Sequence, residues 1–245
     1  IWGGRRYCSL DYMLKERYSE KLYKLSLNGG MTCPNRDGKI SEGGCIFCSA
    51  GGSGDFAANF NPDIAKQIEQ AKTLVSKKYQ GNRFIAYFQA YTNTYAPVEY
   101  LRKLFMDTIM RDDIAILSIA TRPDCLSDDV IELLAELNRI KPVWVELGLQ
   151  TINESTARLI NRGYELSCYD EAVRRLRNIG VEIITHMIIG LPYETKEDIL
   201  STAEYIGKTA NGIKLQLMHI LKNTKLLEMY EKGEFKALTE KEYRS

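Results

Sequence analysis

Short apolar runs alternate with longer amphipathic stretches along most of the chain. The apolar runs are rich in Ile, Val, Leu, Tyr or Phe and bounded by Gly, Pro, Asn or Asp, which predicts strands at 22–27, 83–89, 114–120, 143–149, 181–189 and 213–221. The amphipathic stretches predict helices at 62–79, 98–111, 127–138, 153–161, 169–179 and 196–209. Six strand–helix units in series predict an α/β fold with a parallel sheet, either an open doubly wound sheet or a partial barrel.

The segments that follow the predicted strands decide between these two folds. Polar or glycine-rich residues follow every strand, at 33–48, 89–95, 121–124, 150–151, 190–192 and 222–223. In barrels of this kind the functional groups gather at the C-terminal ends of the strands. The pattern therefore favours a partial (β/α)6 barrel in which all six loops meet at one mouth.

Three cysteines in the first of these loops are the strongest chemical signal. Cys33, Cys45 and Cys48 form the pattern C-x11-C-x2-C. Three thiolates can hold three irons of a 4Fe-4S cluster and leave the fourth iron open to a chelating ligand. Structural zinc is the alternative; a closed zinc site needs four ligands, and Cys8 is available as the fourth.

Composition narrows the class of protein further. With 44% hydrophobic and 27% charged residues, the 245-residue chain has the make-up of an ordinary globular protein. It shows no apolar run of membrane-span length and no secretory signal pattern, so we expect a cytoplasmic protein that does not act at a membrane and has no disulfide framework. The net charge of +1 indicates no global field that would attract a polyanion.

Eight short segments, in order along the chain, carry a resemblance to a known family. They are T-C-P-N-R-D-G (32–38), G-G-C-I-F-C-S (43–49), G-S-G-D-F-A (52–57), Y-F-Q-A-Y-T-N-T-Y-A-P (87–97), A-T-R-P-D (120–124), E-L-G-L-Q-T (146–151), I-N-R-G (160–163) and I-I-G-L-P-Y-E-T (188–195). Together they resemble the bacterial radical S-adenosylmethionine (radical SAM) family related to the catalytic subunit of Elongator. The branch includes a queuine lyase and an enzyme that modifies the wobble uridine of tRNA.

This resemblance implies a fold, cofactors and a partner. The implied fold is a partial (β/α)6 barrel that forms a single radical SAM domain over 1–245, with an N-terminal extension at 1–20. The implied cofactors are a 4Fe-4S cluster and S-adenosylmethionine, and the implied partner is an electron donor such as flavodoxin or ferredoxin. Because the chain opens on Ile1 and relatives run on further, we also expect a C-terminal portion to be missing.

The resemblance also assigns roles to individual residues. Cys33, Cys45 and Cys48 would ligate the cluster. The residues expected to bind the cofactor are Gln89, Thr121, Arg122, Gln150, Arg162 and Gly190. The usual Gly-Gly-Glu motif is replaced here by 89–93, and Arg-Gly-His is replaced by Arg-Gly-Tyr at 162–164. For Arg162 a surface arginine, and for Gly190 a simple strand-ending turn, are the alternative interpretations.

A nucleobase substrate would need hydrogen-bonding groups inside the barrel. Glu146 and His186 lie in predicted strands, and Tyr91 follows another, so we expect these three to be catalytic or substrate-binding. Asp55 and His219 are further candidates. The alternative for His186 is a buried core residue, since isoleucines surround it in the sequence.

The substrate can be a free base or a base within tRNA. The near-neutral charge favours a small free base, because enzymes that bind tRNA neutralise several phosphates. We therefore expect a lyase that cleaves queuine to 7-aminomethyl-7-deazaguanine. The alternative reaction removes the carboxymethyl group from 5-carboxymethylaminomethyl uridine in tRNA.

Overall fold

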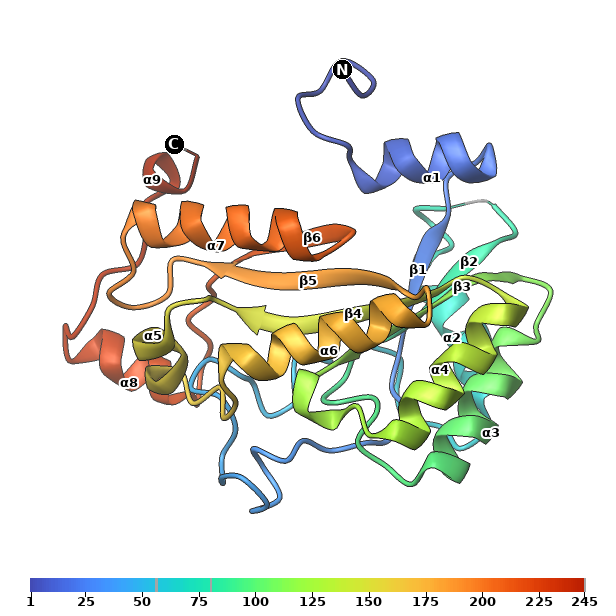
Figure 1. Cartoon of the computed structure of the whole chain (residues 1–245), viewed down its shortest axis with the longest axis horizontal. Helices are drawn as coiled ribbons and strands as arrows, with labels where there is room; N and C mark the ends of the chain where they lie inside the picture. Colours follow the sequence, from blue (N-terminus) through green and yellow to red (C-terminus); the bar gives the residue numbers. More distant parts are fainter. Residues whose placement is uncertain (56, 80, 245) are drawn as a thin grey trace.

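Six parallel strands form one curled sheet. The computed structural model describes residues 1–55, 57–79 and 81–244. The strands are β1 (Tyr23–Leu27), β2 (Phe84–Phe88), β3 (Ile114–Thr121), β4 (Val143–Gln150), β5 (Glu182–Ile189) and β6 (Gly212–Leu217), and they lie side by side in chain order (Figure 1). A doubly wound sheet would reverse its strand order at a switch point. The consecutive order instead confirms the partial (β/α)6 barrel.

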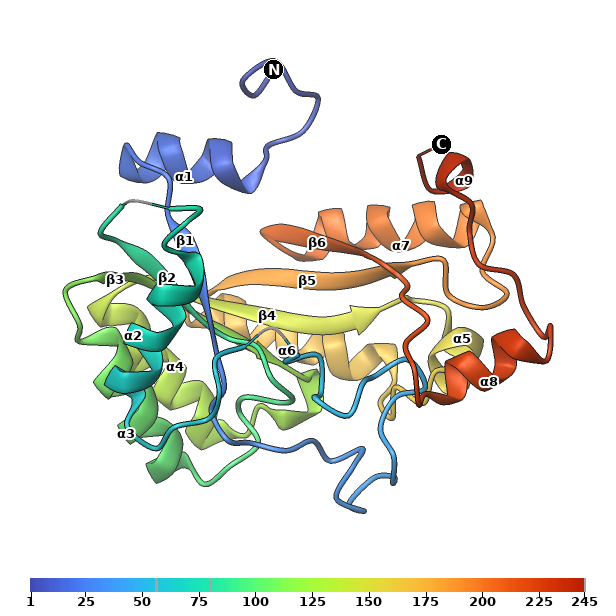
Figure 2. The ribbon, with the colours of Figure 1, turned by 180° about the vertical axis from the view of Figure 1, so that it is seen from behind.

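Helices cover one face of the sheet. These are α2 (Ile64–Val75), α3 (Val98–Ile109), α4 (Asp128–Ile140), α6 (Leu166–Asn178) and α7 (Lys196–Thr209), and Figures 1 and 2 show them along the outside of the curl. Asp63 caps α2 with its side chain, and Thr195 and Asp198 form a capping box on α7. Within the described ranges, no helix has both the length and the apolarity needed to cross a membrane.

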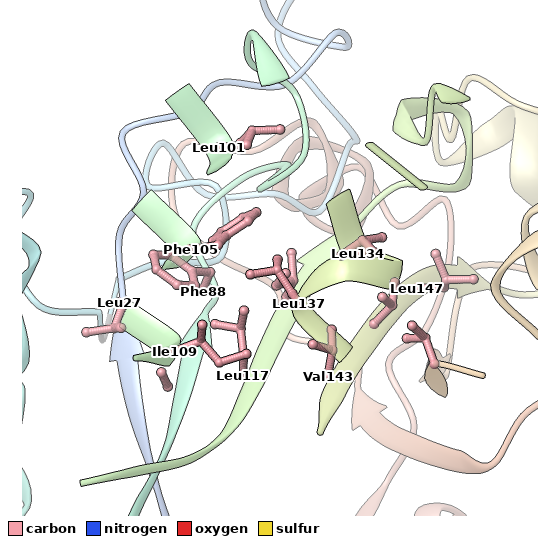
Figure 3. Packing of buried hydrophobic residues seen from close by; sticks show 14 of the residues in the cluster. Leu27, Phe88, Leu101, Phe105, Ile109, Leu117, Leu134, Leu137, Val143 and Leu147 are labelled. Atoms are coloured by element: carbon pink, nitrogen blue, oxygen red, sulfur yellow. The ribbon is translucent and has the colours of Figure 1, made fainter. Parts of the chain in front are cut away.

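The main hydrophobic core lies between these helices and the sheet. Figure 3 shows the outward side chains of the strands meeting the inward side chains of α3 and α4, with Leu27, Phe88, Leu101, Phe105, Ile109, Leu117, Leu134, Leu137, Val143 and Leu147 labelled. All ten are almost fully buried. Burial of one such side chain contributes about 1.5–3 kcal/mol to folding, so this layer supplies most of the rigidity of the strands.

The inner face of the curl begins with an apolar layer. Ile85, Ile116 and Trp144 are buried there together with Leu14 from α1 (Leu10–Tyr18). The sequence analysis did not predict α1, because its amphipathicity is weak and Leu14 is its only buried residue. This layer closes the barrel at the N-terminal ends of the strands, so the C-terminal ends form the open side.

The predicted and observed elements differ mainly near the C-terminus. The sixth strand was expected to reach residue 221 but ends at Leu217, because its partner β5 ends at Ile189 and the last backbone bond runs from Met218 to Ile189. Four short elements, η1 (Pro123–Cys125), α5 (Glu154–Leu159), α8 (Lys225–Glu231) and α9 (Glu240–Arg244), complete the described chain. Of these, α5 matches the predicted helix at 153–161, and η1 and α8 were not predicted.

Candidate active site

One cavity of about 580 Å³ opens at the C-terminal ends of the strands. Eleven of the twelve residues that the sequence analysis singled out as the site line it, namely Cys33, Cys45, Cys48, Gln89, Tyr91, Thr121, Arg122, Glu146, Gln150, Arg162 and His186. His219 also lines it, just beyond the end of β6. The fold thus brings Cys33 and His219, which lie 186 positions apart in the sequence, to a single space.

The three cysteines lie on the segment 28–63, which joins β1 to α2 and is named the cysteine loop below. Side-chain bonds and isolated backbone bonds, such as that from Ile46 to Ile160, hold this loop in place without a strand ladder. Asn35 Nδ2 donates to Cys45 Sγ at 3.6 Å and to the carbonyl of Asn161 at 2.6 Å. The Arg36 guanidinium donates to the carbonyl of Cys48 at 3.3 Å. These bonds leave the three cysteines as free thiols around the mouth.

Tyr91 braces the cysteine loop. Its hydroxyl donates to the carbonyl of Ala50 at 2.7 Å, and its ring lies 5.6 Å from the Arg36 guanidinium. Gly52 has φ of 59°, and a Cβ at that position would lie 2.2 Å from the Tyr91 ring, so the close approach requires glycine. These contacts favour a role for Tyr91 in holding the loop over the expected catalytic or substrate-binding role.

The arrangement of the cysteines bears on the zinc alternative. Zn–S bonds of about 2.3 Å would bring the sulfurs within about 4 Å of one another. A closed zinc site also needs a fourth ligand at the same distance from the metal as the three cysteines. The exposed Cys8 belongs to the segment before α1, which Figures 1 and 2 place on the opposite side of the molecule from the cysteine loop. A zinc site completed by Cys8 is therefore disfavoured.

Gln150 ends β4 in an unusual state. Its φ is 70°, a conformation that is costly for a residue other than glycine. Its side-chain Oε1 is buried and finds no hydrogen-bond partner among the described residues. A buried polar atom without a partner costs about 1–3 kcal/mol. Strain and an unpaired acceptor at the cavity wall are typical of a ligand-binding position.

The other strand-end groups are partly engaged with the protein itself. Gln89 donates from Nε2 to the carbonyl of Ser53 at 2.8 Å, and Thr121 shares a hydrogen bond of 2.5 Å with Thr94. Gly190 does not line the cavity; a Cβ there would lie 3.0 Å from Leu238, so the segment before α9 covers it. Asp55 accepts a bond from Ser49 at 2.6 Å and does not line the cavity either.

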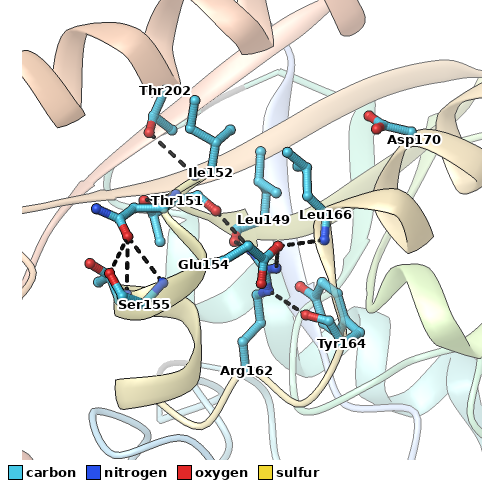
Figure 4. A network of polar contacts seen from close by, with 12 residues as sticks. Leu149, Thr151, Ile152, Glu154, Ser155, Arg162, Tyr164, Leu166, Asp170 and Thr202 are labelled. Carbon is cyan, nitrogen blue, oxygen red and sulfur yellow. Dashed lines mark hydrogen bonds and ion pairs between the residues drawn. The ribbon is translucent and has the colours of Figure 1, made fainter.

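Arg162 is the residue whose expected role fits the structure least. It is 2% exposed, and it donates to the carbonyls of Thr151 at 2.8 Å and Tyr164 at 2.9 Å and to the carboxylate of Glu154 at 2.9 Å (Figure 4). A guanidinium engaged on three sides is poorly placed to take a cofactor carboxylate. The geometry therefore favours a structural role, in which Arg162 ties the loop after β4 to α5.

Arg122 is also engaged, and it encloses an aromatic ring together with Arg162. It forms a bidentate ion pair with Asp124 at 2.7 and 2.9 Å. Both guanidinium groups lie against the ring of Tyr164, 4.9 and 4.8 Å from its centre. Tyr164 in turn donates to the carbonyl of Gly148. The tyrosine that replaces the family histidine thus packs between two arginines, and burial raises its pKa.

The floor of the cavity is a polar layer to which every strand contributes one residue. These residues, named the floor layer below, are Lys24, Tyr87, Ser118, Glu146, His186 and Lys214, in the order β1 to β6. Tyr87 and Ser118 are register partners, as are His186 and Lys214. The period of two along each strand places this layer between the apolar layer of Ile85 and the groups at the mouth.

Glu146 is the centre of the floor layer. It is completely buried and accepts hydrogen bonds from Ser118 at 2.6 Å, His186 at 2.7 Å, Lys214 at 3.4 Å and Lys24. Burial alone would raise the pKa of Glu146, but the bond to His186 and the two ammonium groups hold it well below its usual range. Glu146 is therefore an ionised carboxylate at neutral pH.

Burial has the opposite effect on the histidine of this layer. Desolvation lowers the pKa of His186 below its usual value despite the neighbouring carboxylate. His186 is thus a neutral ring at neutral pH, with one nitrogen directed at Glu146. The sequence left two roles open for His186, a buried core residue and a site residue. Each describes part of its environment, because the side chain is mostly buried and also lines the cavity.

The sequence analysis missed three members of the floor layer that carry its chemistry. Lys24 and Lys214 lie in predicted strands, and a single lysine in a strand usually indicates an exposed edge. Tyr87 was not among the predicted site residues, yet its hydroxyl accepts a bond from Lys214 at 2.9 Å. The available signal was the inward phase of β1, in which Lys24 alternates with Tyr23 and Leu25, two residues that pack in the core. Lys214 gave no such signal, because its neighbours Ile213 and Leu215 are exposed.

Comparisons with known proteins match this geometry. Residues 33–206 match the model of the Radical SAM superfamily. An uncharacterized protein, YtqA of Bacillus subtilis (strain 168), is 48% identical over 240 residues, which cover 98% of this chain and 74% of that protein. A tRNA uridine(34) acetyltransferase of Methanocaldococcus infernus is 28% identical over 133 residues, 51% of this chain and 24% of that protein.

Solved structures show the same fold. An archaeal Elp3 of Methanocaldococcus infernus has a TM-score of 0.66 at 21% identity and covers 90% of this chain, while the chain covers 51% of it. A queuine lyase from Clostridium spiroforme, bound to SAM and queuine, has a TM-score of 0.50 at 17% identity, with 86% of this chain and 83% of that chain covered. At these identities the likeness concerns the fold.

Proposed function

The chain belongs to the radical SAM superfamily, and we propose that it removes a side chain from a modified nucleobase bound between the cysteine loop and the floor layer. Enzymes of this family use a 4Fe-4S cluster and S-adenosylmethionine. When bound, these groups supply a 5′-deoxyadenosyl radical that takes a hydrogen atom from the substrate. One observation carries the proposal: the three cysteines line the same cavity as four residues of the floor layer, Tyr87, Glu146, His186 and Lys214.

The residues at the mouth fit these cofactors. Cys33, Cys45 and Cys48 would hold the cluster, and Asn35 already donates to the sulfur of Cys45. Burial raises the pKa of the Cys45 thiol to about 12, so its thiolate needs a metal to form at neutral pH, and coordination deprotonates a thiol. The guanidinium of Arg36 adds a positive charge beside this sulfur-rich site.

Gln150 and Gln89 are the groups we assign to S-adenosylmethionine. The unpaired Oε1 of Gln150 can accept a hydrogen bond from an amine or a ribose hydroxyl. Gln89 stands at the end of β2, where the family places the group that binds the methionine amine. We assign Arg122 and Arg162 to holding the cavity wall, because their ion pairs lie within the protein.

The floor layer would orient the base and keep water out. Glu146 is a buried carboxylate with a neutral histidine beside it, and such a pair can accept a hydrogen bond from a substrate amine and hold a proton at His186. The apolar layer under it, which contains Trp144 and Leu14, closes the cavity to solvent from below. A reactive radical is protected in such a closed space.

We take 5-carboxymethylaminomethyl uridine of tRNA as the substrate, with loss of the carboxymethyl group as glyoxylate. S-adenosylmethionine would serve as the two-electron oxidant of the C–N bond, and water would supply the aldehyde oxygen on hydrolysis. The sequence likeness over 133 residues to a protein named for tRNA uridine 34 supports it. Queuine as a free base, the reaction expected from the sequence, is the second candidate. The net charge of +1 supports it, since free-base chemistry needs no basic surface for phosphates.

The test is anaerobic turnover of the reconstituted protein with S-adenosylmethionine, with dithionite in place of the natural electron donor. One reaction contains tRNA that carries 5-carboxymethylaminomethyl uridine, and the other contains free queuine. We expect 5-aminomethyl uridine and 5′-deoxyadenosine in the first, read by mass spectrometry, and none of either in a Cys48→Ala control. Release of 7-aminomethyl-7-deazaguanine in the second reaction, with no product in the first, would show that queuine and not the modified uridine is the substrate. No base product in either would refute the proposal.

A further inference from the structure

The floor layer contains more positive than negative charge. Two ammonium groups, those of Lys24 and Lys214, face a single carboxylate, that of Glu146. His186 contributes no charge at neutral pH, because burial lowers its pKa. The layer is largely shielded from water, with the side chains of Lys24 and Lys214 24% and 32% exposed. An uncompensated charge in such surroundings is costly unless a ligand balances it.

The other charged groups around the cavity do not supply the missing anion. Arg122 is paired with Asp124, and Arg162 is paired with Glu154, so the acids nearest to the wall are already taken. The cysteine thiols lie at the mouth, where Arg36 accompanies them. The surplus positive charge therefore belongs to the floor itself.

Lys214 is the ammonium that a ligand can reach. It lines the cavity, whereas Lys24 does not. Its Nζ donates to the Tyr87 hydroxyl at 2.9 Å and to Glu146 at a long 3.4 Å. An ammonium has three N–H donors, and the described residues provide no third acceptor for this one. Burial also lowers the pKa of Lys214, a shift that a bound anion would reverse.

We propose that Lys214 is the anion-binding residue of the cavity floor and that it selects substrates whose side chain ends in a carboxylate. Glu146 keeps Lys24 and His186 in place, and the free N–H of Lys214 takes the substrate carboxylate in a charge-assisted bond. This inference rests on the proposed function, and it names Lys214 as the residue that distinguishes an acidic side chain from a neutral one. A substrate without an anionic group would leave the surplus charge unbalanced.

The expected effect is a preference for acid over ester. A charge-assisted hydrogen bond is typically strong enough to change affinity about 10- to 100-fold. The probes are the nucleoside 5-carboxymethylaminomethyl uridine and its methyl ester, which differ in one negative charge. Their dissociation constants are measured by calorimetry on the anaerobic, cluster-loaded protein with S-adenosylmethionine bound.

We expect the wild type to bind the acid about 10- to 100-fold more tightly than the ester. Lys214→Met and Lys214→Gln should bind both equally, and Lys214→Arg should keep part of the preference. Lys208→Met is the matched control, because Lys208 is an exposed lysine of α7, paired with Glu204. Melting curves identify any variant that does not fold, and the wild-type preference is required in every case.

Several outcomes would overturn the inference. These are equal binding of acid and ester by the wild type, no binding of either, or a preference that survives in Lys214→Met. The binding experiment is separate from the turnover test. If tRNA is not converted but the preference depends on Lys214, the proposed reaction fails and the anion site stands; if tRNA is converted without such a preference, the opposite holds.

Discussion

At the mouth of the cavity the functional groups lie on a loop, whereas at the floor they lie inside strands. The cysteine loop is held by side chains such as Asn35, Arg36 and Tyr91 and by isolated backbone bonds such as that from Ile46 to Ile160, without a strand ladder. The floor layer is held by the backbone ladders of six strands and by the helices packed behind them. The two regions face each other across one cavity.

Because of this difference, we expect cofactor binding to depend on the mouth and the stability of the fold to depend on the floor layer. Removing a thiol from the cysteine loop takes away a ligand but no buried ladder or core contact, so the protein should still fold. Removing a charge from the floor layer breaks a buried network on which the packing of the strands depends. We therefore expect changes at the mouth to affect function alone and changes at the floor to affect both function and stability.

The largest expected effect is at the mouth. Cys33→Ala, Cys45→Ala or Cys48→Ala should each abolish the visible iron–sulfur absorption and all turnover, while the melting temperature of the metal-free protein stays close to that of the wild type. Cys125→Ala is the control and should keep about four irons and four sulfides per chain. Iron and sulfide assays make the measurement. Zinc in place of iron and sulfide in the wild type would contradict the cluster assignment.

At the floor, Glu146→Gln should destabilise the protein and stop turnover together. It leaves Lys24 and Lys214 without their shared carboxylate, and breaking a buried pair costs about 3–5 kcal/mol. Glu136→Gln is the matched control, since its pair with Arg102 is exposed and should contribute less than about 1 kcal/mol. Urea denaturation gives both values. If the two variants are equally stable, the floor is not the structural unit that we describe.

Two residues of the same wall sharpen the comparison further. Gln150→Ala should weaken binding of S-adenosylmethionine about tenfold with little change in stability, because its Oε1 makes no bond within the described protein.

Arg162→Ala should lower the free energy of unfolding by about 2–3 kcal/mol, because it leaves Glu154 and two carbonyls without a donor. Equilibrium dialysis and denaturation separate the two effects. If both variants lose the same affinity for S-adenosylmethionine, Arg162 binds the cofactor as the sequence analysis expected.

The smallest expected effect is a dependence of stability on pH at the rim of the mouth. Burial raises the pKa of Glu194 to about 7 from a usual 4.5. The folded protein therefore holds a proton there that the unfolded chain releases above about pH 4.5, so this contribution is present at low pH and is lost as the pH rises through about 7.

Glu194→Gln isolates this contribution. The variant keeps the hydrogen-bonding capacity of a neutral carboxyl, so the difference in unfolding free energy between variant and wild type should increase in favour of the variant between pH 5 and pH 8. Using the difference removes the opposing contributions of Glu146 and His186, whose pKa values are lowered. Urea titrations at several pH values give it. A constant difference would show that Glu194 is ionised in the folded protein.

The sequence predicted the mouth better than the floor. The three cysteines lie within sixteen consecutive residues, and the groups after each strand were readable because loops and strands differ in composition. Gln150 was named for its place after Gly148, but its strained backbone and unpaired oxygen are visible only in the structure. For Arg162 the sequence could not show the buried ion pair with Glu154, because that pair depends on how the loop folds back on α5.

By itself the sequence determined the strands and the outer helices of this radical SAM enzyme, and it singled out the three cysteines that we propose as cluster ligands. Each of these depends on apolar periodicity or on spacing within a short stretch, and such local patterns can be recognised in the sequence directly. Only the tertiary structure decided the floor layer, because its residues lie on six different strands between positions 24 and 214. They meet only when strand register and sheet curvature bring one side chain from each strand to the same depth in the barrel. A lysine in an isolated strand indicates an exposed edge; two lysines that converge on one buried carboxylate indicate a site, and that convergence is a property of the barrel.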